Sequence, residues 1–476
     1  MFIGRERELE FLNNCYNSAD AEFVVLYGRR RVGKTDTLTE FCKNKPHVFY
    51  LCREYTDTQQ RTEFSKALLS FSDTFSSFPD TFSDWDKAFA FMGNLSFDKK
   101  TVIVIDEFPY MCKGNKSIPS VLQIAWDTIL HAKNIMLVLC GSSMSFIEDD
   151  LLAKKNPLYG RTTGIYKMLP MPYYDAVKFV PNFTDEEKLI ACSILGGIPH
   201  YLKRFDSNKT LAQNIIGEIL TKGRTLYTEV EFLIHQELRE TSVYNTIIDA
   251  IALGNTSLNN IYTKTNIDKT KLSVYLKNLI ELGLVEKEFP VLTSEKEQAN
   301  GNRGLYNLTD NYFRFWYAFC YGNLSALEQG EASETYEDFI KNELHDFCGK
   351  PFEKICIEYL YVLNKRKSLP FRFTQIGRWW GKVTHRNANN KLETSIEEID
   401  IVAADKAQQN FIVGECKFTN EPFDMGQLKA LQNKISFHGT IYYYLFSLNG
   451  FTDGVQKYAA DNPNIVLVTA QDILRA

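Results

Sequence analysis

The sequence predicts a multidomain α/β fold, in which a parallel sheet comes first and a second, separate α/β domain comes last. Its 476 residues are too many for one ordinary core and suggest about three domains. Apolar runs in the first third have the length and composition of strands buried on both faces of a parallel sheet. Two further strand-like runs, 396–403 and 411–417, stand close together near the end of the chain and predict a hairpin in another sheet.

A complete phosphate-binding loop follows the first apolar run. Residues 28–35 read Gly-Arg-Arg-Arg-Val-Gly-Lys-Thr, after the apolar run 23–27 and before a segment, 38–41, that can begin a helix. In this arrangement the glycines let backbone N–H groups wrap a triphosphate, while the lysine reaches its outer oxygens and the threonine hydroxyl ligates Mg2+. We therefore expect nucleotide contacts from Gly28, Arg29, Arg30, Arg31, Val32, Gly33, Lys34, Thr35 and Asp36, with Thr35 also a metal ligand.

Two carboxylates end the next strand-like run. Residues 101–105 are apolar or uncharged, and Asp106 and Glu107 follow them directly. Ligands bind at the carboxyl ends of strands in open α/β sheets, so Asp106 is expected to hold Mg2+ and Glu107 to orient the attacking water. The alternative is that the two charges only end the strand in solvent.

Two more residues are candidates for contact with the terminal phosphate. The third apolar run, 135–140, leads into Gly-Ser-Ser, where Ser142 is expected beside the strand that bears Asp106 and can sense a γ-phosphate. The alternative for Ser142 is a simple turn. Arg161 follows a turn, and its guanidinium suits the charge of a transferring phosphate. The alternative for Arg161 is a solvated surface side chain.

Six ordered motifs carry a family resemblance. They lie at residues 2–9, 28–35, 106–110, 141–143, 157–161 and 196–202. This set resembles the archaeal-type ATPases of the STAND class, which are AAA-related P-loop switches. The resemblance implies binding of ATP, ADP and Mg2+, with Gly4 and Arg5 near the adenine. It also implies that Pro199, in a Gly-x-Pro turn of a helical lid, responds to nucleotide state. We expect the ATPase core at 1–155 and the lid at 156–238.

The middle of the chain, expected at 239–322, has the element order of a winged helix. Apolar residues recur with helical spacing from about residue 240, and a second helix at 271–282 is ended by Gly283. The expected buried face of that helix consists of Leu272, Leu276, Leu279 and Ile280. A strand, a polar loop and a returning strand are then expected at 284–289, 293–303 and 304–308.

Lysines on this second helix leave two interpretations open. Lys269, Lys271 and Lys277 lie on its polar side and suit contact with nucleic-acid phosphates in a groove. The alternative is that they are solvated lysines on a module that packs against its neighbours. The segment after the first strand carries Glu295 and Glu297 and forms no basic stripe, which favours the alternative.

The last third of the chain contains a second set of charged residues with a chemical pattern. Glu415 and Lys417 are two residues apart, so in a strand they point to the same face, and Asp400 on the neighbouring strand comes within reach. Two carboxylates with a lysine supply a Mg2+ site, formed by Asp400 and Glu415, and a group that activates water. These are the parts that a metal-dependent phosphodiester hydrolase needs.

The order of elements around these residues also resembles a known fold. A helix at 352–360 can deliver Glu353 to the same site, and a helix that begins near Gln427 follows the second strand. This order looks like a PD-(D/E)xK nuclease core, a restriction-endonuclease-like α/β domain, which we place at 323–476. The resemblance implies catalytic roles for Glu353, Asp400, Glu415 and Lys417. The alternative is a degenerate nuclease fold that serves as an interaction module.

A run of basic residues precedes this second site. It interleaves with aromatic residues and suits a phosphate backbone with stacked bases, or else is a charged edge over an aromatic core. The basic members are Lys365, Arg366, Lys367, Arg372, Arg378, Lys382, His385 and Arg386, and the aromatic members are Phe371, Phe373, Trp379 and Trp380.

Composition limits the remaining possibilities. The net charge of -5 gives no global basic footprint, so contact with nucleic acid needs a local patch. The ten cysteines never form a C-x-x-C pair and several lie in apolar runs, which is typical of reduced thiols in the cytoplasm. No run approaches the roughly 20 apolar residues that span a bilayer. We therefore expect a cytoplasmic protein without membrane contact, and the sequence does not indicate an oligomeric state.

The combined prediction is an ATP-hydrolysing, STAND-like switch coupled to a Mg-dependent nuclease-like domain that acts on DNA or RNA. The alternative is an ATP-dependent regulatory protein whose C-terminal and winged-helix domains only bind a partner protein or DNA.

Overall fold

A computed structural model describes residues 2–71, 81–96, 98–144, 146–299, 301, 303–386, 392–434 and 437–475. Residues 299, 384–386, 392 and 393 are described as backbone only. The chain divides into two compact units. Unit 1 comprises residues 1–171 with 198–200, and unit 2 comprises residues 172–197 with 201–476. Among the helices in these ranges, none is long and apolar enough to cross a membrane.

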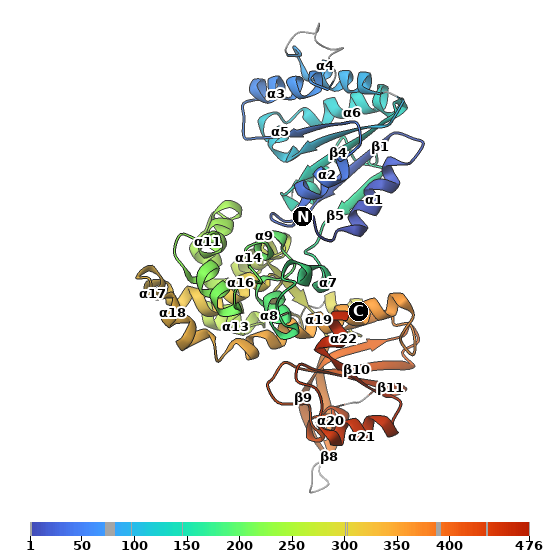
Figure 1. The fold of residues 1–476 in the computed structure, drawn as a ribbon. Coiled ribbons are helices and arrows are strands. Elements are labelled where there is room, and N and C mark those ends of the chain that lie inside the picture. Colours follow the sequence, from blue (N-terminus) through green and yellow to red (C-terminus); the bar gives the residue numbers. More distant parts are fainter. Residues whose placement is uncertain are drawn as a thin grey trace. The chain divides into compact units, whose positions relative to one another are not determined.

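Unit 1 is built on a five-stranded parallel sheet with the strand order β2-β3-β4-β1-β5 (Figure 1). The three apolar runs expected to be central strands form β1, β3 and β4, and β3 and β4 are buried along their whole length. The strands are β1 (Glu22–Tyr27), β2 (His47–Leu51), β3 (Thr101–Asp106), β4 (Ile135–Gly141) and β5 (Gly164–Lys167). Strand β5 lies beyond residue 155, where the core was expected to end, and completes the sheet.

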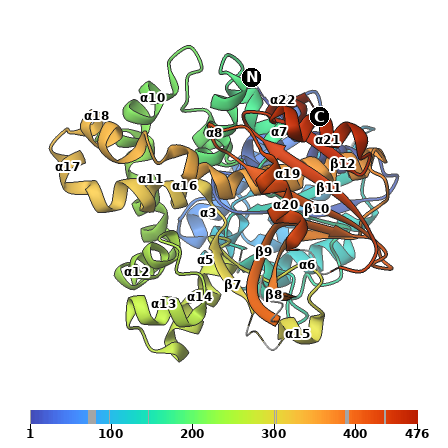
Figure 2. The same ribbon diagram turned by 90° about the horizontal axis from the view of Figure 1, so that it is seen from below.

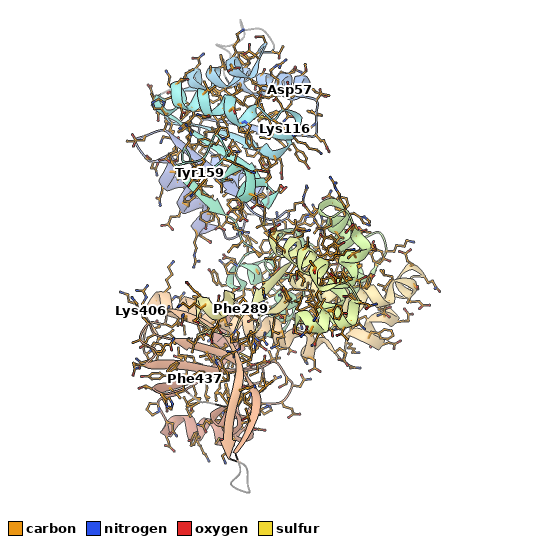
Figure 3. All side chains as sticks on the ribbon, turned by 180° about the vertical axis from the view of Figure 1, so that it is seen from behind. Asp57, Lys116, Tyr159, Phe289, Lys406 and Phe437 are labelled. Atoms are coloured by element: carbon orange, nitrogen blue, oxygen red, sulfur yellow. The ribbon has the colours of Figure 1, made fainter. Side chains whose placement is uncertain are left out.

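Helices cover both faces of this sheet, which explains why its central strands are apolar throughout. On one face, alternate strand residues such as Phe23, Ile103 and Leu137 pack in a single core with residues of α3, α4 and α6. Helix α1 contacts β1, and helix α2 contacts β3. The helices of unit 1 are α1 (Glu6–Tyr16), α2 (Lys34–Cys42), α3 (Asp57–Leu69), α4 (Trp85–Phe91), α5 (Phe108–Gly114) and α6 (Ile118–Thr128). Asp57 and Lys116 are labelled in this part of Figure 3.

Unit 2 begins with a helical region. Its helices are α7 (Tyr173–Ala176), α8 (Asp185–Leu195), α9 (Pro199–Leu202), α10 (Leu211–Asn214) and α11 (Thr225–Glu237), where the first two residues of α9 group with unit 1. Helix α8 begins with a capping box, in which Thr184 and Glu187 satisfy each other's backbone N–H groups.

Three helices and a two-stranded antiparallel hairpin follow, whereas two helices were predicted before the hairpin. They are α12 (Thr241–Ala252), α13 (Leu258–Thr265), α14 (Lys269–Glu281), β6 (Val285–Glu288) and β7 (Leu305–Leu308). Gly283 follows α14 with a φ of 66°, as the predicted helix end requires. The assignment of this module as a winged helix stays a prediction.

Two details of this module differ from expectation. Ile280 is 37% exposed, whereas Leu272, Leu276 and Leu279 are buried, because Ile280 lies about 80° around the helix axis from Leu272. The predicted polar loop at 293–303 contains a short helix, α15 (Glu295–Ala299), in which Glu297 and Ser294 satisfy each other's polar groups. Lys269, Lys271 and Lys277 are exposed, as expected for either interpretation of this helix.

Short helices connect this module to the C-terminal domain. They are α16 (Asn311–Phe315), α17 (Leu324–Glu328) and α18 (Ala332–Thr335), and the long helix α19 (Leu344–Arg366) follows them. Helix α19 extends well beyond the predicted segment 352–360 at both ends. Its C-terminus is closed by Lys367 in a left-handed conformation.

The C-terminal domain is built on a mixed five-stranded sheet with the order β12-β11-β10-β9-β8. Strands β8, β9 and β10 are antiparallel, whereas β10, β11 and β12 are parallel. Figure 2 shows β8 and β9 as a long curved hairpin. The strands are β8 (Gln375–Arg386), β9 (Leu392–Ala404), β10 (Asn410–Lys417), β11 (Thr440–Ser447) and β12 (Ile465–Thr469).

One core packs against this sheet. Val402, Val413 and Leu445 meet Leu428 of α20 (Met425–Asn433) and Val455 of α21 (Asp453–Asp461). Phe437, which Figure 3 labels, stacks on Phe411 with ring centroids 5.1 Å apart. Helix α22 (Ala470–Arg475) closes the chain. The predicted hairpin of β9 and β10 is present, although β9 begins four residues earlier than expected.

Candidate functional sites

The loop between β1 and α2 has the shape that its glycines allow. A Cβ atom at Gly28 would lie 2.3 Å from the carbonyl oxygen of Met168, so only glycine fits at this position. Gly33 caps α2 with a φ of 90°, and Arg31 also has a positive φ of 71°. Helix α2 therefore begins directly after the loop, and the positive end of its dipole favours an anion there.

Lys34 lies beneath this loop. Its side-chain ammonium donates hydrogen bonds to the carbonyl oxygens of Gly28 and Arg29, at 2.9 and 3.0 Å, and the residue is only 6% exposed. Burial lowers the pKa of Lys34, while Cys140, Glu107 and Asp106 act in the opposite direction. A buried cation with neutral carbonyl partners is suited to exchange them for charged phosphate oxygens.

Thr35 and Asp106 come together across the sheet edge. The Thr35 hydroxyl donates to Asp106 Oδ2 at 2.7 Å, and Asp106 is fully buried at the end of β3. The other carboxylate oxygen of Asp106 accepts the backbone N–H of Glu107 at 2.9 Å. A hydroxyl and a carboxylate at this spacing are hard oxygen donors that fit Mg2+.

Glu107 is held against the end of the neighbouring strand. Its Oε2 accepts the Ser142 hydroxyl at 2.9 Å and the Ser142 backbone N–H at 3.2 Å. Glu107 itself has a positive φ of 52°. The predicted positions of Ser142 and Asp106 on adjacent strands are thus realised, because β3 pairs directly with β4. The role of Ser142 as a sensor of the γ-phosphate stays a prediction.

The residues assigned to the adenine and to the lid also lie around the loop. The Arg5 guanidinium is buried and donates to Glu8 Oε1 at 2.6 Å, to the Val32 carbonyl at 2.6 Å and to the Leu169 carbonyl at 2.8 Å. Arg5 therefore stabilises the phosphate-binding loop through its hydrogen bond to the Val32 carbonyl. Gly4, next to Arg5, has a positive φ of 67°.

Pro199 lies next to the phosphate-binding loop. A Cβ atom at Gly33 would lie 3.6 Å from Pro199 Cγ, and Pro199 is itself buried. This places the start of α9 beside the cap of α2.

The remaining predicted residues of this site differ in their environment. Arg161 pairs with Asp127, with its Nε 2.9 Å from each carboxylate oxygen, and donates to the Pro157 carbonyl at 2.8 Å. Arg30 donates to the Tyr110 hydroxyl at 3.4 Å, and Asp36 is exposed on the first turn of α2.

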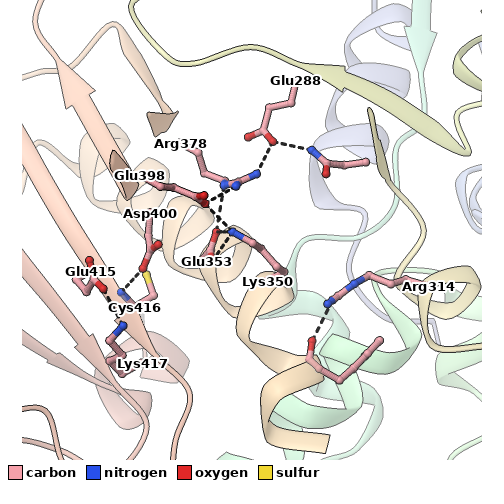
Figure 4. A network of polar contacts seen from close by, with 12 residues as sticks. Glu288, Arg314, Lys350, Glu353, Arg378, Glu398, Asp400, Glu415, Cys416 and Lys417 are labelled. Carbon is pink, nitrogen blue, oxygen red and sulfur yellow. Dashed lines mark hydrogen bonds and ion pairs between the residues drawn. The ribbon is translucent and has the colours of Figure 1, made fainter. Parts of the chain in front are cut away.

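The second site lies in the C-terminal domain, where four predicted residues gather (Figure 4). The register that pairs Val413 with Val402 places the next residues on the same face, Glu415 and Asp400, opposite each other. Lys417 donates to Glu415 Oε1 at 2.7 Å, and Asp400 Oδ2 accepts the backbone N–H of Cys416 at 2.8 Å. Glu353 of α19 is buried beside them.

Burial and the repulsion of a neighbouring carboxylate raise the pKa values of Glu353 and Asp400. Burial and the nearby Asp400 raise the pKa of Glu353 to about 7, although Lys350 and Arg378 oppose this. Burial and Glu415 raise the pKa of Asp400 against the effect of the Cys416 N–H. Carboxylates in this state favour a bound cation or proton, which is typical of functional sites.

The carboxylates of this site form ion pairs with cations that the sequence analysis did not assign to it. Lys350 lies 3.1 Å from Glu353 and 2.9 Å from Glu398, and Lys434 lies 3.5 Å from Glu415. Arg378 contacts Glu353 at 3.5 Å, Glu288 at 2.8 Å, and also Glu398. Lys350, one helical turn before Glu353, and Glu398, two residues before Asp400 on the strand, could have been found from spacing. Lys434 and Glu288 give no such signal.

Other predictions for this region have mixed outcomes. In the described part of the chain, no three His, Cys, Asp or Glu side chains are grouped closely enough to hold a metal ion by themselves. The Gln427 side chain accepts the Asp424 N–H at 2.9 Å and so caps α20. In the basic run, Arg378 is engaged in ion pairs and Trp379 contacts Phe437, which favours the interpretation as a charged edge over an aromatic core. The side chains of His385 and Arg386 lie outside the described residues.

Two protein families match parts of the chain. Residues 2–205 match an ATPase domain that occurs predominantly in Archaea. Residues 316–432 match a family of archaeal and bacterial proteins of unknown function.

Individual proteins match over longer and shorter stretches. The uncharacterized protein MJECL04 of Methanocaldococcus jannaschii is 33% identical over 418 residues, which cover 88% of each chain. The uncharacterized ATP-binding protein MJ0423 of the same organism is 51% identical over 45 residues, which cover 10% of this chain and 76% of that protein.

Solved structures show weaker likeness. The Walker-type ATPase PABY2304 of Pyrococcus abyssi is 21% identical with a TM-score of 0.49, covering 66% of this chain and 96% of that one. The STAND protein PH0952 of Pyrococcus horikoshii, which has a tetratricopeptide repeat sensor, is 15% identical with a TM-score of 0.28, covering 77% and 51%.

Proposed function

Since the chain belongs to the same family as MJECL04 of Methanocaldococcus jannaschii and carries the archaeal-type ATPase domain, we propose that it is a STAND-like ATP switch whose output is a metal-dependent nuclease. The observation that carries the nuclease half is the pairing of Asp400 with Glu415 on adjacent strands, beside Lys417. The substrate class is nucleic acid, because this set of groups suits a phosphodiester bond.

In the ATPase half, each residue has a role that follows from its contacts. Lys34 would exchange the carbonyls of Gly28 and Arg29 for phosphate oxygens, and Thr35 and Asp106 would hold Mg2+. Glu107 would orient the attacking water, and Ser142 fixes the direction of its carboxylate. The bound Mg2+ supplies charge neutralisation at the phosphate oxygens.

Pro199 is suited to report the state of this site. It lies beside Gly33, the cap of α2, where phosphate oxygens would bind. We infer that binding of ATP shifts the cap and thereby the start of α9. In this proposal the lid is the segment 156–238, and α9 is the part of it that lies beside the phosphate-binding loop.

In the C-terminal domain, the residues divide into two roles. Asp400 and Glu415 would hold the metal ion, and Lys417 would stabilise charge on the phosphate. Glu353, with a pKa raised to about 7, can bind or release a proton near neutral pH and would exchange it with water at the site.

A second candidate function has a specific observation in its favour. The carboxylates Glu353 and Glu415 are ion-paired with the chain's own lysines and arginine, as in an interaction module without metal. In that case the ATPase is a slow switch, and the C-terminal domain and the winged-helix module only dock a partner protein or DNA. The exposed Lys269, Lys271 and Lys277 would then be the contact of that module with DNA.

A nuclease assay separates the two functions. The purified protein is incubated with DNA and RNA, each single- and double-stranded, with Mg2+ or Mn2+ and with ATP, ADP or no nucleotide. We expect cleavage that falls about 10^2-fold or more in Glu415→Gln, because a metal ligand loses its charge. The matched control is Glu421→Gln, an exposed glutamate just beyond the same strand. Absence of cleavage under every condition would reject the nuclease and favour docking.

A further inference from the structure

Two acidic side chains of β6 hold cations of the C-terminal domain. Glu286 Oε1 accepts a hydrogen bond from Lys354 of α19 at 2.6 Å. Glu288 Oε2 accepts one from Arg378 of β8 at 2.8 Å (Figure 4). A carboxylate of the middle module therefore lies on Arg378, which contacts the carboxylate cluster of Glu353, Glu398, Asp400 and Glu415, and another lies on Lys354, the residue after Glu353 in α19.

Hydrogen bonds to two backbone carbonyls of β8 also hold the same hairpin in place. The Val291 N–H, just after β6, donates to the carbonyl of Arg378 at 2.8 Å, and the Arg303 guanidinium donates to the carbonyl of Trp380 at 2.9 Å. The hairpin thus packs along β8. These hydrogen bonds, in addition to the ion pairs, hold Glu286 next to Lys354 and Glu288 next to Arg378.

The charges at this place are finely balanced. The C-terminal domain contributes five cations, Lys350, Lys354, Arg378, Lys417 and Lys434, against four carboxylates, Glu353, Glu398, Asp400 and Glu415. These cations exceed the carboxylates by one. With Glu286 and Glu288 added, the carboxylates exceed the cations by one. Glu286 and Glu288 therefore add two negative charges next to these cations, of which Arg303 of the same hairpin offsets one.

We propose that Lys350, Lys354 and Arg378 form a surface that binds the phosphodiester backbone of a nucleic acid, and that Glu286 and Glu288 block this surface as internal mimics of phosphate. This inference rests on the proposed function, because the surface borders the proposed nuclease site and governs the approach of its substrate. The blocked state is the one that the structure describes.

Burial predicts the order in which the two contacts exchange. The side chains of Lys354 and Glu286 are 50% and 43% exposed, and an exposed pair of this kind contributes little stability, so a phosphate can replace Glu286 readily. The Arg378 side chain is only 12% exposed and holds three carboxylates, so its release is costlier. The guanidinium fork accepts phosphate in the same geometry as carboxylate. We expect Lys354 to be freed first.

A double-mutant cycle on the exposed pair tests the proposal. Binding is measured by fluorescence polarisation with a fluorescein-labelled DNA duplex of about 20 base pairs, in EDTA and at several salt concentrations. Glu286→Gln frees Lys354, so we expect a Kd several-fold tighter and a log Kd against log salt slope steeper by about 0.9. Lys354→Gln alone should weaken binding, but less than it does in the Glu286→Gln background, because Glu286 partly neutralises that lysine in the unmodified protein. Combined with Glu286→Gln, it should cancel the gain.

The control variant is Glu295→Gln, which removes an exposed charge from the segment between the two strands of the same hairpin. A gain of equal size in Glu295→Gln, or no gain in Glu286→Gln, would overturn the proposal. Circular dichroism checks that all variants fold, which half-exposed positions should permit. RNA and single-stranded probes distinguish the source of the phosphodiester backbone. Tighter binding without cleavage would reject the nuclease alone, whereas cleavage by the unmodified protein without the gain would reject this surface alone.

Discussion

The phosphate-binding loop and the C-terminal carboxylate cluster are both polar and largely buried, but they are held together by different kinds of contact. In the loop, Lys34 is held by backbone carbonyls and Thr35 by a single carboxylate. In the cluster, Glu353 and Glu415 are held by charged side chains from several distant segments. A site formed by a contiguous motif needs few external supports, whereas a site assembled from separate elements depends on each of them.

The difference also appears in the protonation behaviour of the cluster. Burial alone raises the pKa of Glu398, yet Arg378 and Lys350 reverse this and lower it to about 2. Glu353 shares the same two cations, but burial and Asp400 keep its pKa near 7. Two carboxylates in one network, Glu353 and Glu398, are therefore biased to opposite protonation states.

The largest expected effect tests whether the loop acts through its local contacts. Lys34→Ala removes the lysine of the phosphate-binding loop, which is predicted to reach the outer phosphates, so we expect kcat/KM for Mg-ATP to fall by about 10^3-fold. Release of phosphate is the measurement. Lys43→Ala is the matched control, because Lys43 follows the same helix and forms an exposed pair with Glu40. Activity within a few-fold of the unmodified protein in Lys34→Ala would show that this loop is not the hydrolytic site.

The contrast between the two sites also explains what could be predicted from sequence. The loop, Asp106, Glu107 and Ser142 lie where the motifs place them, because parallel strand order fixes which strand ends are neighbours. The match over residues 2–205 agrees with the predicted archaeal-type ATPase. Asp400, Glu415 and Lys417 were brought together correctly by the two-residue period of strands. Lys434 and Glu288 were missed, because their contacts depend on tertiary packing that no local spacing encodes.

A half-buried carboxylate outside the cluster, Glu358, sharpens the comparison of charge environments. Glu358 of α19 accepts the Tyr173 N–H at 2.9 Å, and burial raises its pKa to about 7 from an ordinary 4.5. The folded chain thus holds this proton more tightly than the unfolded chain, so stability falls as pH rises from 4.5 to 7. The loss is at most roughly 3 kcal/mol.

Glu358→Gln should remove this dependence, because the amide oxygen still accepts the N–H but carries no charge. Thermal unfolding should show the variant more stable than the unmodified protein at pH 8, and the two nearly equal at pH 4. Glu334→Gln, an exposed glutamate of α18, is the control and should change neither curve. Parallel pH profiles for Glu358→Gln and the unmodified protein would contradict the raised pKa.

The smallest expected effect concerns the contact between two strand ends in the loop site. Ser142→Ala removes the hydroxyl that holds Glu107 at 2.9 Å but keeps the backbone N–H at 3.2 Å. The carboxylate loses part of its orientation, so kcat should fall about tenfold while KM changes little. Ser143→Ala, the adjacent hydroxyl, is the control for the turn. A rise in kcat would reverse the interpretation, because Ser142 would then restrain Glu107 until phosphate draws the hydroxyl away. The loop site would in that case resemble the C-terminal cluster, in which the chain's own groups occupy the positions that a substrate must claim.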